Sequence, residues 1–267
     1  MSGSDGNDDD LGRRLEVATR AARAGGALAL DYFRRRDTLA VEHKGKQDLV
    51  SRADREVEEL IRAELAAAFP GDPVLGEEGG GGDAERTWVI DPIDGTLNFL
   101  RGVPCWCVVI AYVAAGRTVV GVTYDPVHDE LFAAARGRGA TRNGEPIRVS
   151  GAAEPSDSMV GVTFNFKQPP EHYTAMMGRL IEGGFEHRRL GSTAVTLCYV
   201  ADGRCDALVT LDCSSWDVLA GLLTVEEAGG VASDYVRMHG LLGKGGVIAS
   251  TPALAEVVKE VSGLAPG

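Results

Sequence analysis

The sequence Trp-Val-Ile-Asp-Pro-Ile-Asp-Gly-Thr-Leu-Asn-Phe, residues 88–99, is the most informative part of the chain. Its apolar start, residues 88–90, predicts a buried strand that ends at Asp91. A proline then turns the chain, a second carboxylate follows at Asp94, and a Gly-Thr pair can open a helix. Two carboxylates beside a helix N-terminus can hold a divalent cation and a phosphate together. The motif therefore indicates phosphate-ester chemistry.

The composition is that of a soluble globular protein with a substantial core. The 267 residues are 44% apolar and 25% charged, and no apolar stretch is long enough to span a membrane. A net charge of −12 argues against a nucleic-acid partner. The five cysteines lack zinc spacing, so we expect reduced thiols and a cytoplasmic location. Residues 1–10 are rich in Asp, Gly and Ser, have no signal-peptide pattern, and are predicted to form a disordered acidic tail.

The order of predicted elements changes near residue 150. Before it, we expect a long helix, a second helix that Ser51 caps with Asp54 in the capping-box position, and several strands that include an Asn143–Gly144 hairpin. After it, strands and helices alternate. This pattern predicts an N-terminal α+β subdomain and a C-terminal α/β subdomain, residues 11–150 and 151–267. The predicted helices are 13–36, 171–182, 193–201, 217–228 and 253–261, and the predicted strands are 88–90, 108–113, 118–124, 130–135, 158–164, 207–211 and 247–249.

Acidic residues occur in four short patterns, and each alone has a structural explanation. Asp54 can serve only as a helix cap, and Glu77 and Glu78 can be solvated charges beside a Gly-rich loop. Asp94 with the following glycine is a common turn pair, and Asp217 is a plausible N-cap for a helix that begins one residue later. Their joint occurrence favours a shared site.

Taken together, these patterns resemble the inositol monophosphatase family of magnesium-dependent, lithium-sensitive phosphatases. Its Gly-Glu-Glu, Asp-Pro-Ile-Asp-Gly-Thr-x-Asn-Phe and Trp-Asp-x-x-Ala-Gly motifs occur in order at residues 76–78, 91–99 and 216–221. Residues 48–54 match a fourth motif, Asp-Leu-Val-Thr-x-x-Asp, with Ser51 in place of threonine. The resemblance spans roughly residue 11 to the C-terminus. It implies a layered αβαβα sandwich of the inositol monophosphatase and fructose-1,6-bisphosphatase type.

The carboxylates suit magnesium. Four negative charges in one pocket raise one another's pKa unless cations neutralise them, and carboxylates without His or Cys favour Mg²⁺ over zinc. The resemblance implies two to three ions per site. It assigns Glu77, Asp91 and the Ile93 carbonyl to one ion, Asp91, Asp94 and Asp217 to a second, and a position near Glu77 to a weaker third.

The resemblance also implies how catalysis proceeds. Asp54 and Thr96 form a hydrogen-bonded pair that orients and deprotonates a water molecule near Glu77, and the second ion stabilises the leaving alkoxide. Asp94 and the backbone N–H groups of Gly95 and Thr96 belong to the phosphate site.

The roles of two further residues are left open by the sequence. Lys44 matches a lysine that the family places near the weak metal site, although a solvated loop lysine is an equal alternative. Glu78 is a possible additional member of the site.

The reaction is better defined than the substrate. Residues 191–193 match the loop that the family places against the leaving group, with Ser192 also a plausible helix cap. Thr210 stands where inositol-type relatives have a glutamate that contacts a substrate hydroxyl, and Asp212 can compensate or lie on a surface turn. The expected substrate-binding residues are Gly191, Ser192, Thr193, Thr210 and Asp212.

We therefore expect a phosphate monoester hydrolase acting on a small polyol or sugar phosphate. The alternatives are a histidinol-phosphate, nucleotide or aminocyclitol phosphatase of a specialised pathway and, less favoured, a non-catalytic binding or regulatory protein. The expected partner is a small-molecule phosphate monoester, with no nucleic acid and no membrane. The resemblance further implies a homodimer.

Overall fold

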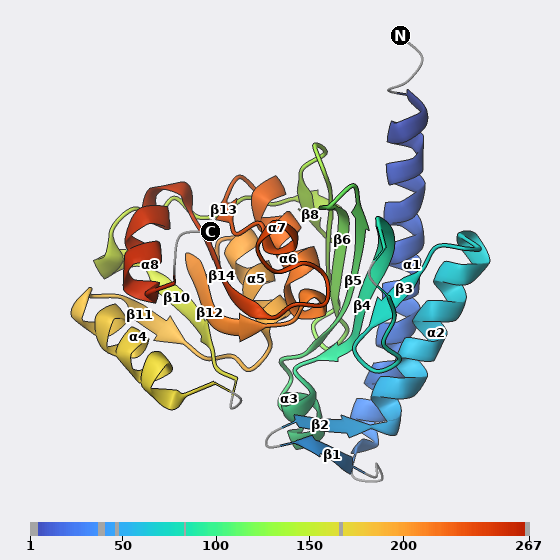
Figure 1. Ribbon diagram of the computed structural model, residues 1–267, viewed down its shortest axis with the longest axis horizontal. Helices are drawn as coiled ribbons and strands as arrows, with labels where there is room; N and C mark the ends of the chain where they lie inside the picture. The colour runs from blue at the N-terminus through green and yellow to red at the C-terminus, as the bar shows by residue number, and fades with distance from the viewer. Residues whose placement is uncertain (1–4, 37–40, 46–47, 83, 166–167, 265–267) are drawn as a thin grey trace.

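Five layers of alternating helices and sheets make up the molecule (Figure 1). The computed structural model describes residues 5–36, 41–45, 48–82, 84–165 and 168–264, with side chains described except at 5–8 and 41–50. A helix pair covers a seven-stranded sheet, a second pair lies between this sheet and a five-stranded sheet, and a third pair covers the outer face. This is the layered α+β architecture that the sequence predicts.

The first layer consists of α1 (Asp5–Arg34) and α2 (Arg52–Ala68), which pack on each other and on the larger sheet. The antiparallel pair β1 (Val41–Gly45) and β2 (Asp48–Ser51) connects them. Because α1 begins at Asp5, the disordered tail predicted for residues 1–10 is wrong for residues 5–10. Acidic residues are favourable near a helix N-terminus, and Asp10 pairs with Arg14 one turn later.

The larger sheet has the order β3-β4-β5-β6-β7-β8-β9, with a parallel β3–β4 pair and antiparallel pairs elsewhere. The predicted hairpin turn joins its last two strands, and both Asn143 and Gly144 have positive φ. The strands are β3 (Val74–Gly76), β4 (Arg86–Asp94), β5 (Cys107–Ala114), β6 (Arg117–Asp125), β7 (Glu130–Ala135), β8 (Ala140–Arg142) and β9 (Glu145–Pro146).

The smaller sheet has the order β11-β10-β12-β14-β13. Its strands are β10 (Met159–Thr163), β11 (Glu186–Arg188), β12 (Ala207–Cys213), β13 (Val231–Ala232) and β14 (Gly245–Ser250). The two sheets lie on either side of residue 150 in sequence but share the middle helix layer. The remaining helices are α3 (Thr96–Arg101), η2 (Pro155–Asp157), α4 (Pro170–Glu182), α5 (Thr193–Ala201), α6 (Ser215–Glu227), α7 (Tyr235–His239), η3 (Pro252–Leu254) and α8 (Ala255–Ser262).

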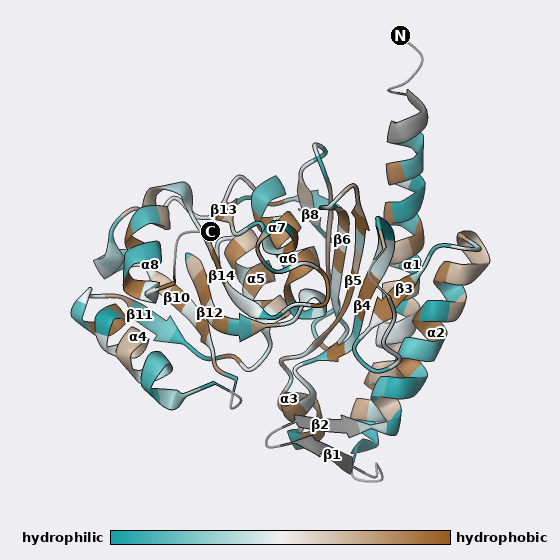
Figure 2. Ribbon diagram, viewed as in Figure 1, coloured by the Kyte–Doolittle hydropathy of each residue, from teal (hydrophilic) through white to brown (hydrophobic). Residues whose placement is uncertain are grey.

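Hydrophobic residues are concentrated in the sheets and in the middle helices α5 and α6 (Figure 2). A helix with sheets on both sides has no solvent face, so its sequence is apolar all round. The helix α6 lies very close to strand β6, because a Cβ at Gly121 of β6 would lie 2.7 Å from the Ala220 carbonyl oxygen of α6. Under the other face of the larger sheet, the fully buried Trp106 packs on Phe33 and Phe99. Among the described residues, no helix is long and apolar enough to cross a membrane.

An Arg14→Met variant is expected to lower the free energy of unfolding by about 2 kcal/mol. The Arg14 side chain is only 7% exposed, pairs with Asp72, and places its guanidinium carbon 3.9 Å from the Tyr112 ring centroid. Methionine fills the space but leaves Asp72 without this cation. Urea denaturation measures the effect, with Arg20→Met as the control, because the exposed Arg20–Glu64 pair contributes little. Equal losses in both variants would contradict the prediction.

Candidate metal centre

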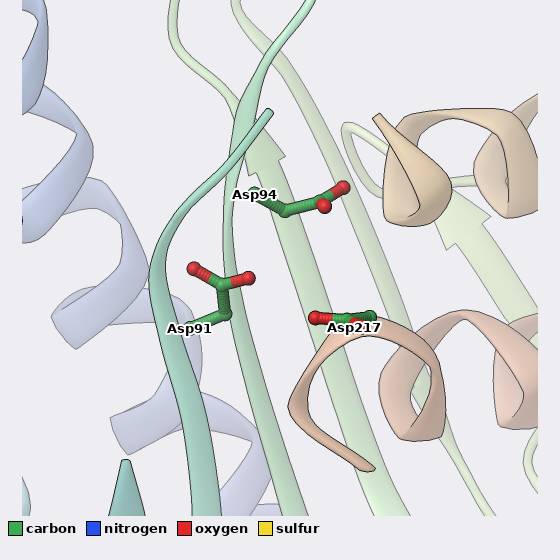
Figure 3. Close-up of side chains that lie close together, drawn as sticks. All are labelled: Asp91, Asp94 and Asp217. Atoms are coloured by element: carbon green, nitrogen blue, oxygen red, sulfur yellow. The ribbon is translucent and has the colours of Figure 1, made fainter. Parts of the chain in front are cut away.

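Two neighbouring aspartates of β4 and a third that is distant in sequence converge between the two halves of the fold. Asp91 and Asp94 lie on β4, and Asp217 lies in the first turn of α6 (Figure 3). Each offers a carboxylate oxygen within 4.8 Å of those offered by the other two. Asp91 and Asp94 are buried and Asp217 is partly exposed, so the cluster is open to solvent on one side. Three hard oxygen donors at this spacing fit a Mg²⁺ ion.

An irregularity in β4 brings its two aspartates to the same site. The strand does not end at Asp91, as the sequence suggested, but continues to Asp94 with a register shift between them. Such a shift interrupts the alternation of side chains, so two carboxylates three positions apart can face one cavity. Gly95 then has φ of +94° and a Cβ there would lie 3.0 Å from the Cys105 carbonyl oxygen. Both facts require glycine at the predicted turn into α3.

Each aspartate of the cluster is oriented by a backbone N–H group. Asp91 accepts from the Ile93 N–H at 2.9 Å, and Asp217 accepts from the Ser214 N–H at 2.8 Å. Asp94 reaches across to the start of α5, where it accepts from the Ala194 N–H at 2.7 Å and from the Ser192 hydroxyl. One oxygen of each carboxylate is thereby fixed, and the other can face a cation. Asp217 is the third residue of α6 and not its N-cap, as one interpretation of the sequence had it; Ser214 is the cap.

Glu77 lies beside the cluster at the end of β3. Its N–H donates to the Ile90 carbonyl, one residue before Asp91, and its charge raises the pKa of Asp91. The turn that carries it is held by Glu58, a fully buried residue that accepts from the N–H groups of Glu78 and of the following glycine at 2.8 and 2.7 Å. Glu58 was not among the residues predicted from the sequence. Its signal was a carboxylate on the apolar face of α2, three residues before the buried Ile61.

Asp54 and Thr96 do not form the hydrogen bond that the resemblance implied. The Thr96 hydroxyl donates to the Ile93 carbonyl at 3.0 Å. Asp54 accepts from the N–H and the hydroxyl of Ser51, both at 2.8 Å, in the predicted capping box. Asp54 is nevertheless buried, and the charge of Glu78 raises its pKa further after the larger effect of burial. It is therefore electrostatically linked to the Gly-Glu-Glu turn.

The raised pKa values of these carboxyl groups indicate that their charged forms are unfavourable unless a cation binds. Burial raises the pKa of Asp54 and of Asp94 to about 6 and that of Asp217 to about 7. Burial, and then the charges of Glu77, Asp94 and Asp217, raise the pKa of Asp91 well above its usual value. A bound divalent cation would lower these pKa values, because it favours the charged carboxylates. The neighbouring Cys107 thiol has a pKa raised by burial, so it stays protonated and does not compete as a ligand.

An Asp217→Asn variant of the metal-free protein is expected to be more stable than the wild type at pH 8, by about 2 kcal/mol. The pKa of Asp217 rises from 3.8 in the unfolded chain to about 7 in the folded protein, so the folded state binds more protons between these values. The free energy of unfolding of the wild type therefore decreases as pH rises from about 4 to about 7. The variant does not show this decrease, because it has no carboxyl group at position 217. Thermal unfolding in EDTA at pH 4 and pH 8 measures the difference. A stability difference between the variant and the wild type that is no larger at pH 8 than at pH 4 would contradict the expectation.

The predicted substrate residues occupy different environments. Ser192 is buried as the N-cap of α5, between Asp94 and the helix, and Gly191 and Thr193 flank it. Thr210 is fully buried, and its hydroxyl donates to the Asp212 carbonyl at 3.2 Å. Asp212 is partly exposed. Lys44 belongs to β1, but its side chain lies outside the described residues.

Comparison with known proteins gives a consistent result. A model of the inositol monophosphatase family matches residues 10–263. The Nus factor SuhB of Pasteurella multocida is 40% identical over 253 residues, which cover 92% of this chain and 93% of that relative. The structure of extragenic suppressor protein suhB from Bartonella henselae has a TM-score of 0.87 at 32% identity and covers 94% of this chain and 99% of its own. An inositol monophosphatase from Anabaena (Nostoc) has a TM-score of 0.82 at 34% identity, with coverages of 94% and 96%.

Proposed function

Because the chain belongs to the inositol monophosphatase family, we propose that it is a Mg²⁺-dependent phosphatase that hydrolyses a monoester of a small polyol or sugar. The observation that carries this proposal is the cluster of Asp91, Asp94 and Asp217, whose oxygens lie within 4.8 Å of one another. Buried carboxylates without cations are costly, and this arrangement is therefore best explained by divalent ions.

Mg²⁺ would be held by the residues at the end of β4 and their neighbours, with two to three ions per site. When bound, it supplies charge neutralisation for the phosphate, a more acidic water and stabilisation of the leaving oxygen. We assign its ligands to Glu77, Asp91, the Ile93 carbonyl, Asp94 and Asp217, with Glu78 and Lys44 as possible outer members.

Asp54 is the proposed proton acceptor. Its pKa of about 6 lies close enough to neutral pH for a general base. Thr96 would relay the proton from water to Asp54, which requires its hydroxyl to turn away from the Ile93 carbonyl. Glu77 would orient the same water. The N–H groups of Gly95 and Thr96, together with Asp94, would bind the phosphate, and Gly191, Ser192 and Thr193 would face the leaving group.

Phosphate release tests this function. Phenyl phosphate and glycerol 2-phosphate are to be incubated with the purified chain in EDTA and in Mg²⁺. We expect release only with Mg²⁺ and its loss in an Asp91→Asn variant. Release that does not depend on Mg²⁺, or none from any phosphate monoester in a panel with inositol, histidinol, aminocyclitol and nucleotide members, would overturn the proposal.

A second candidate function follows from the relatives' names. The protein at 40% identity is a Nus factor, and this chain would then act as one, with or without catalysis. Wild type and Asp91→Asn are to be expressed in Pasteurella multocida that lacks its own SuhB. Rescue by both supports a role that does not require hydrolysis, whereas failure of both opposes this candidate.

We also propose a homodimer, on the resemblance to the family alone. Sedimentation velocity at micromolar concentration tests it, and a species at the 28.1 kDa mass of one chain would contradict it.

A further inference from the structure

An ion pair on α2 holds the turn that carries Glu77. Glu58 is almost completely buried on this helix, and Arg62, one helical turn later, donates from Nε to a Glu58 carboxylate oxygen at 2.8 Å. The two oxygens of the same carboxylate accept from the N–H groups of Glu78 and Gly79 at 2.8 and 2.7 Å. One buried carboxylate therefore joins the helix to the turn.

The guanidinium of Arg62 holds both ends of the same turn. Its Nη1 donates to the Val74 carbonyl at 3.0 Å, and its Nη2 donates to the Gly80 carbonyl at 2.7 Å. Val74 begins β3, and Gly80 closes the turn through two backbone hydrogen bonds with Gly76, at 3.0 and 3.1 Å. Each of the three guanidinium nitrogens thus has its own acceptor, an arrangement that the single nitrogen of a lysine cannot reproduce.

The turn fits closely around the ion pair. A Cβ at Gly76 would lie 2.5 Å from a Glu58 carboxylate oxygen, and a Cβ at Gly79 would lie 2.6 Å from the same oxygen. Neither glycine has a positive φ, so the backbone conformation does not require glycine at these positions. A side chain at either position would instead push the Glu58 carboxylate out of its hydrogen bonds.

The backbone of the sheet alone gives Glu77 little support. It follows β3, which is the edge strand of the larger sheet and has three residues. Its N–H group donates to the Ile90 carbonyl at 3.3 Å, which is long for such a bond. The helix behind the turn is firmly anchored, because Val57 and Ile61 on α2 are fully buried. The ion pair therefore connects a weakly held turn to a fixed helix.

The charges of the site explain why Glu77 needs this support. Gly76 lies opposite Ile90 in the parallel register of β3 and β4, so Glu77 comes beside Asp91 on the next strand. Without a cation the two carboxylates repel each other, and this repulsion favours movement of the edge strand away from β4. Because Arg62 neutralises Glu58, the pair fixes the turn without adding net charge next to the carboxylates.

We propose that Glu58 and Arg62 are positioning residues that hold Glu77 in place for Mg²⁺ and thereby set the affinity of the ion that Glu77 binds. This inference rests on the proposed function, which assigns Glu77 to the metal site. Removing a residue that orients a metal ligand typically weakens metal binding by about 10- to 100-fold. Neither residue belongs to the cluster of Asp91, Asp94 and Asp217, so turnover with the ions bound should depend little on the pair.

Mg²⁺ titrations of a Glu58→Gln variant test the inference with two readouts. Glutamine keeps the size of the side chain but turns an NH₂ group toward one backbone N–H, which then lacks its acceptor. The Mg²⁺ dissociation constant, obtained from the rise in melting temperature with Mg²⁺ concentration, should increase about tenfold. The Mg²⁺ concentration for half-maximal hydrolysis of phenyl phosphate should increase by the same factor, with kcat at saturating Mg²⁺ little changed.

Two further variants complete the test. Arg62→Lys keeps a cation near Glu58 but loses the planar fork that holds the turn, so the Mg²⁺ dissociation constant should increase in the same direction by a smaller factor. This variant decides the question if Glu58→Gln does not fold. Glu64→Gln breaks a partly exposed ion pair between the same helix and Arg20, and it should change neither readout.

The outcomes separate this inference from the function beneath it. Lower stability of the variants with an unchanged Mg²⁺ dissociation constant would show a purely structural role and overturn the inference, and hydrolysis by the wild type would still support the phosphatase. A large fall in kcat without a change in Mg²⁺ affinity would also overturn it. A wild type that binds Mg²⁺ and hydrolyses no ester would overturn the function and leave the inference to the binding data. A wild type whose melting temperature does not respond to Mg²⁺ would overturn both.

Discussion

An Asp91→Asn variant should lose at least about 1,000-fold in kcat/KM for any phosphate monoester that the wild type hydrolyses, the scale for removing one or more preorganised electrostatic elements. Asp91 is 1% exposed and lies close enough to Glu77, Asp94 and Asp217 for all three charges to raise its pKa. It is also the residue that the resemblance to the family assigns to two ions. The loss of the Asp91 carboxylate should weaken the binding of both ions. Steady-state kinetics over a range of Mg²⁺ concentrations measure the resulting fall in kcat/KM.

The same variant should be more stable than the wild type when metal is absent. Asparagine keeps the shape of the side chain and an acceptor for the Ile93 N–H, and it removes a buried charge from the cluster. We expect a gain of about 1 to 3 kcal/mol in EDTA at pH 8. Asp125→Asn is the matched control, because Asp125 is equally buried but accepts from two N–H groups and the His128 ring. Destabilisation of both variants in EDTA would contradict a metal role for Asp91.

The layered fold was predictable because local and global signals agree. The apolar runs of β5, β6 and β7, the capping box at Ser51 and the Asn143–Gly144 turn each predict the element that the structure shows. The short strands β11 and β13 and the helix α7 were missed. They have two to five residues each, which is too few to show a period in sequence.

Positions in the site were harder to predict than its residues. The register shifts in β4 and β12 move Asp94 and Asp212, and the hydrophobic pattern of a strand does not predict such shifts. The hydrogen-bond partner of the Thr96 hydroxyl was also hard to predict. Several acceptors lie within its reach, and the sequence gives no distances with which to choose among them. Glu58 was missed because a helix of this composition normally exposes its glutamates.

An Asp94→Asn variant should lower kcat by at least about 100-fold at saturating Mg²⁺. Asp94 joins the two halves of the site, because it lies on β4 and accepts hydrogen bonds from Ser192 and Ala194 at the start of α5. The resemblance to the family also assigns Asp94 to the ion that stabilises the leaving oxygen. Asparagine can preserve the contact with α5 but removes the charge.

The control separates these two roles of Asp94. Ser192→Ala removes one hydrogen bond to the carboxylate and leaves its charge, so we expect a loss of about tenfold or less. A larger effect of Asp94→Asn than of Ser192→Ala therefore reports the charge and not the contact with α5. Near-normal turnover of Asp94→Asn at saturating Mg²⁺ would show that its charge is not part of the catalytic site.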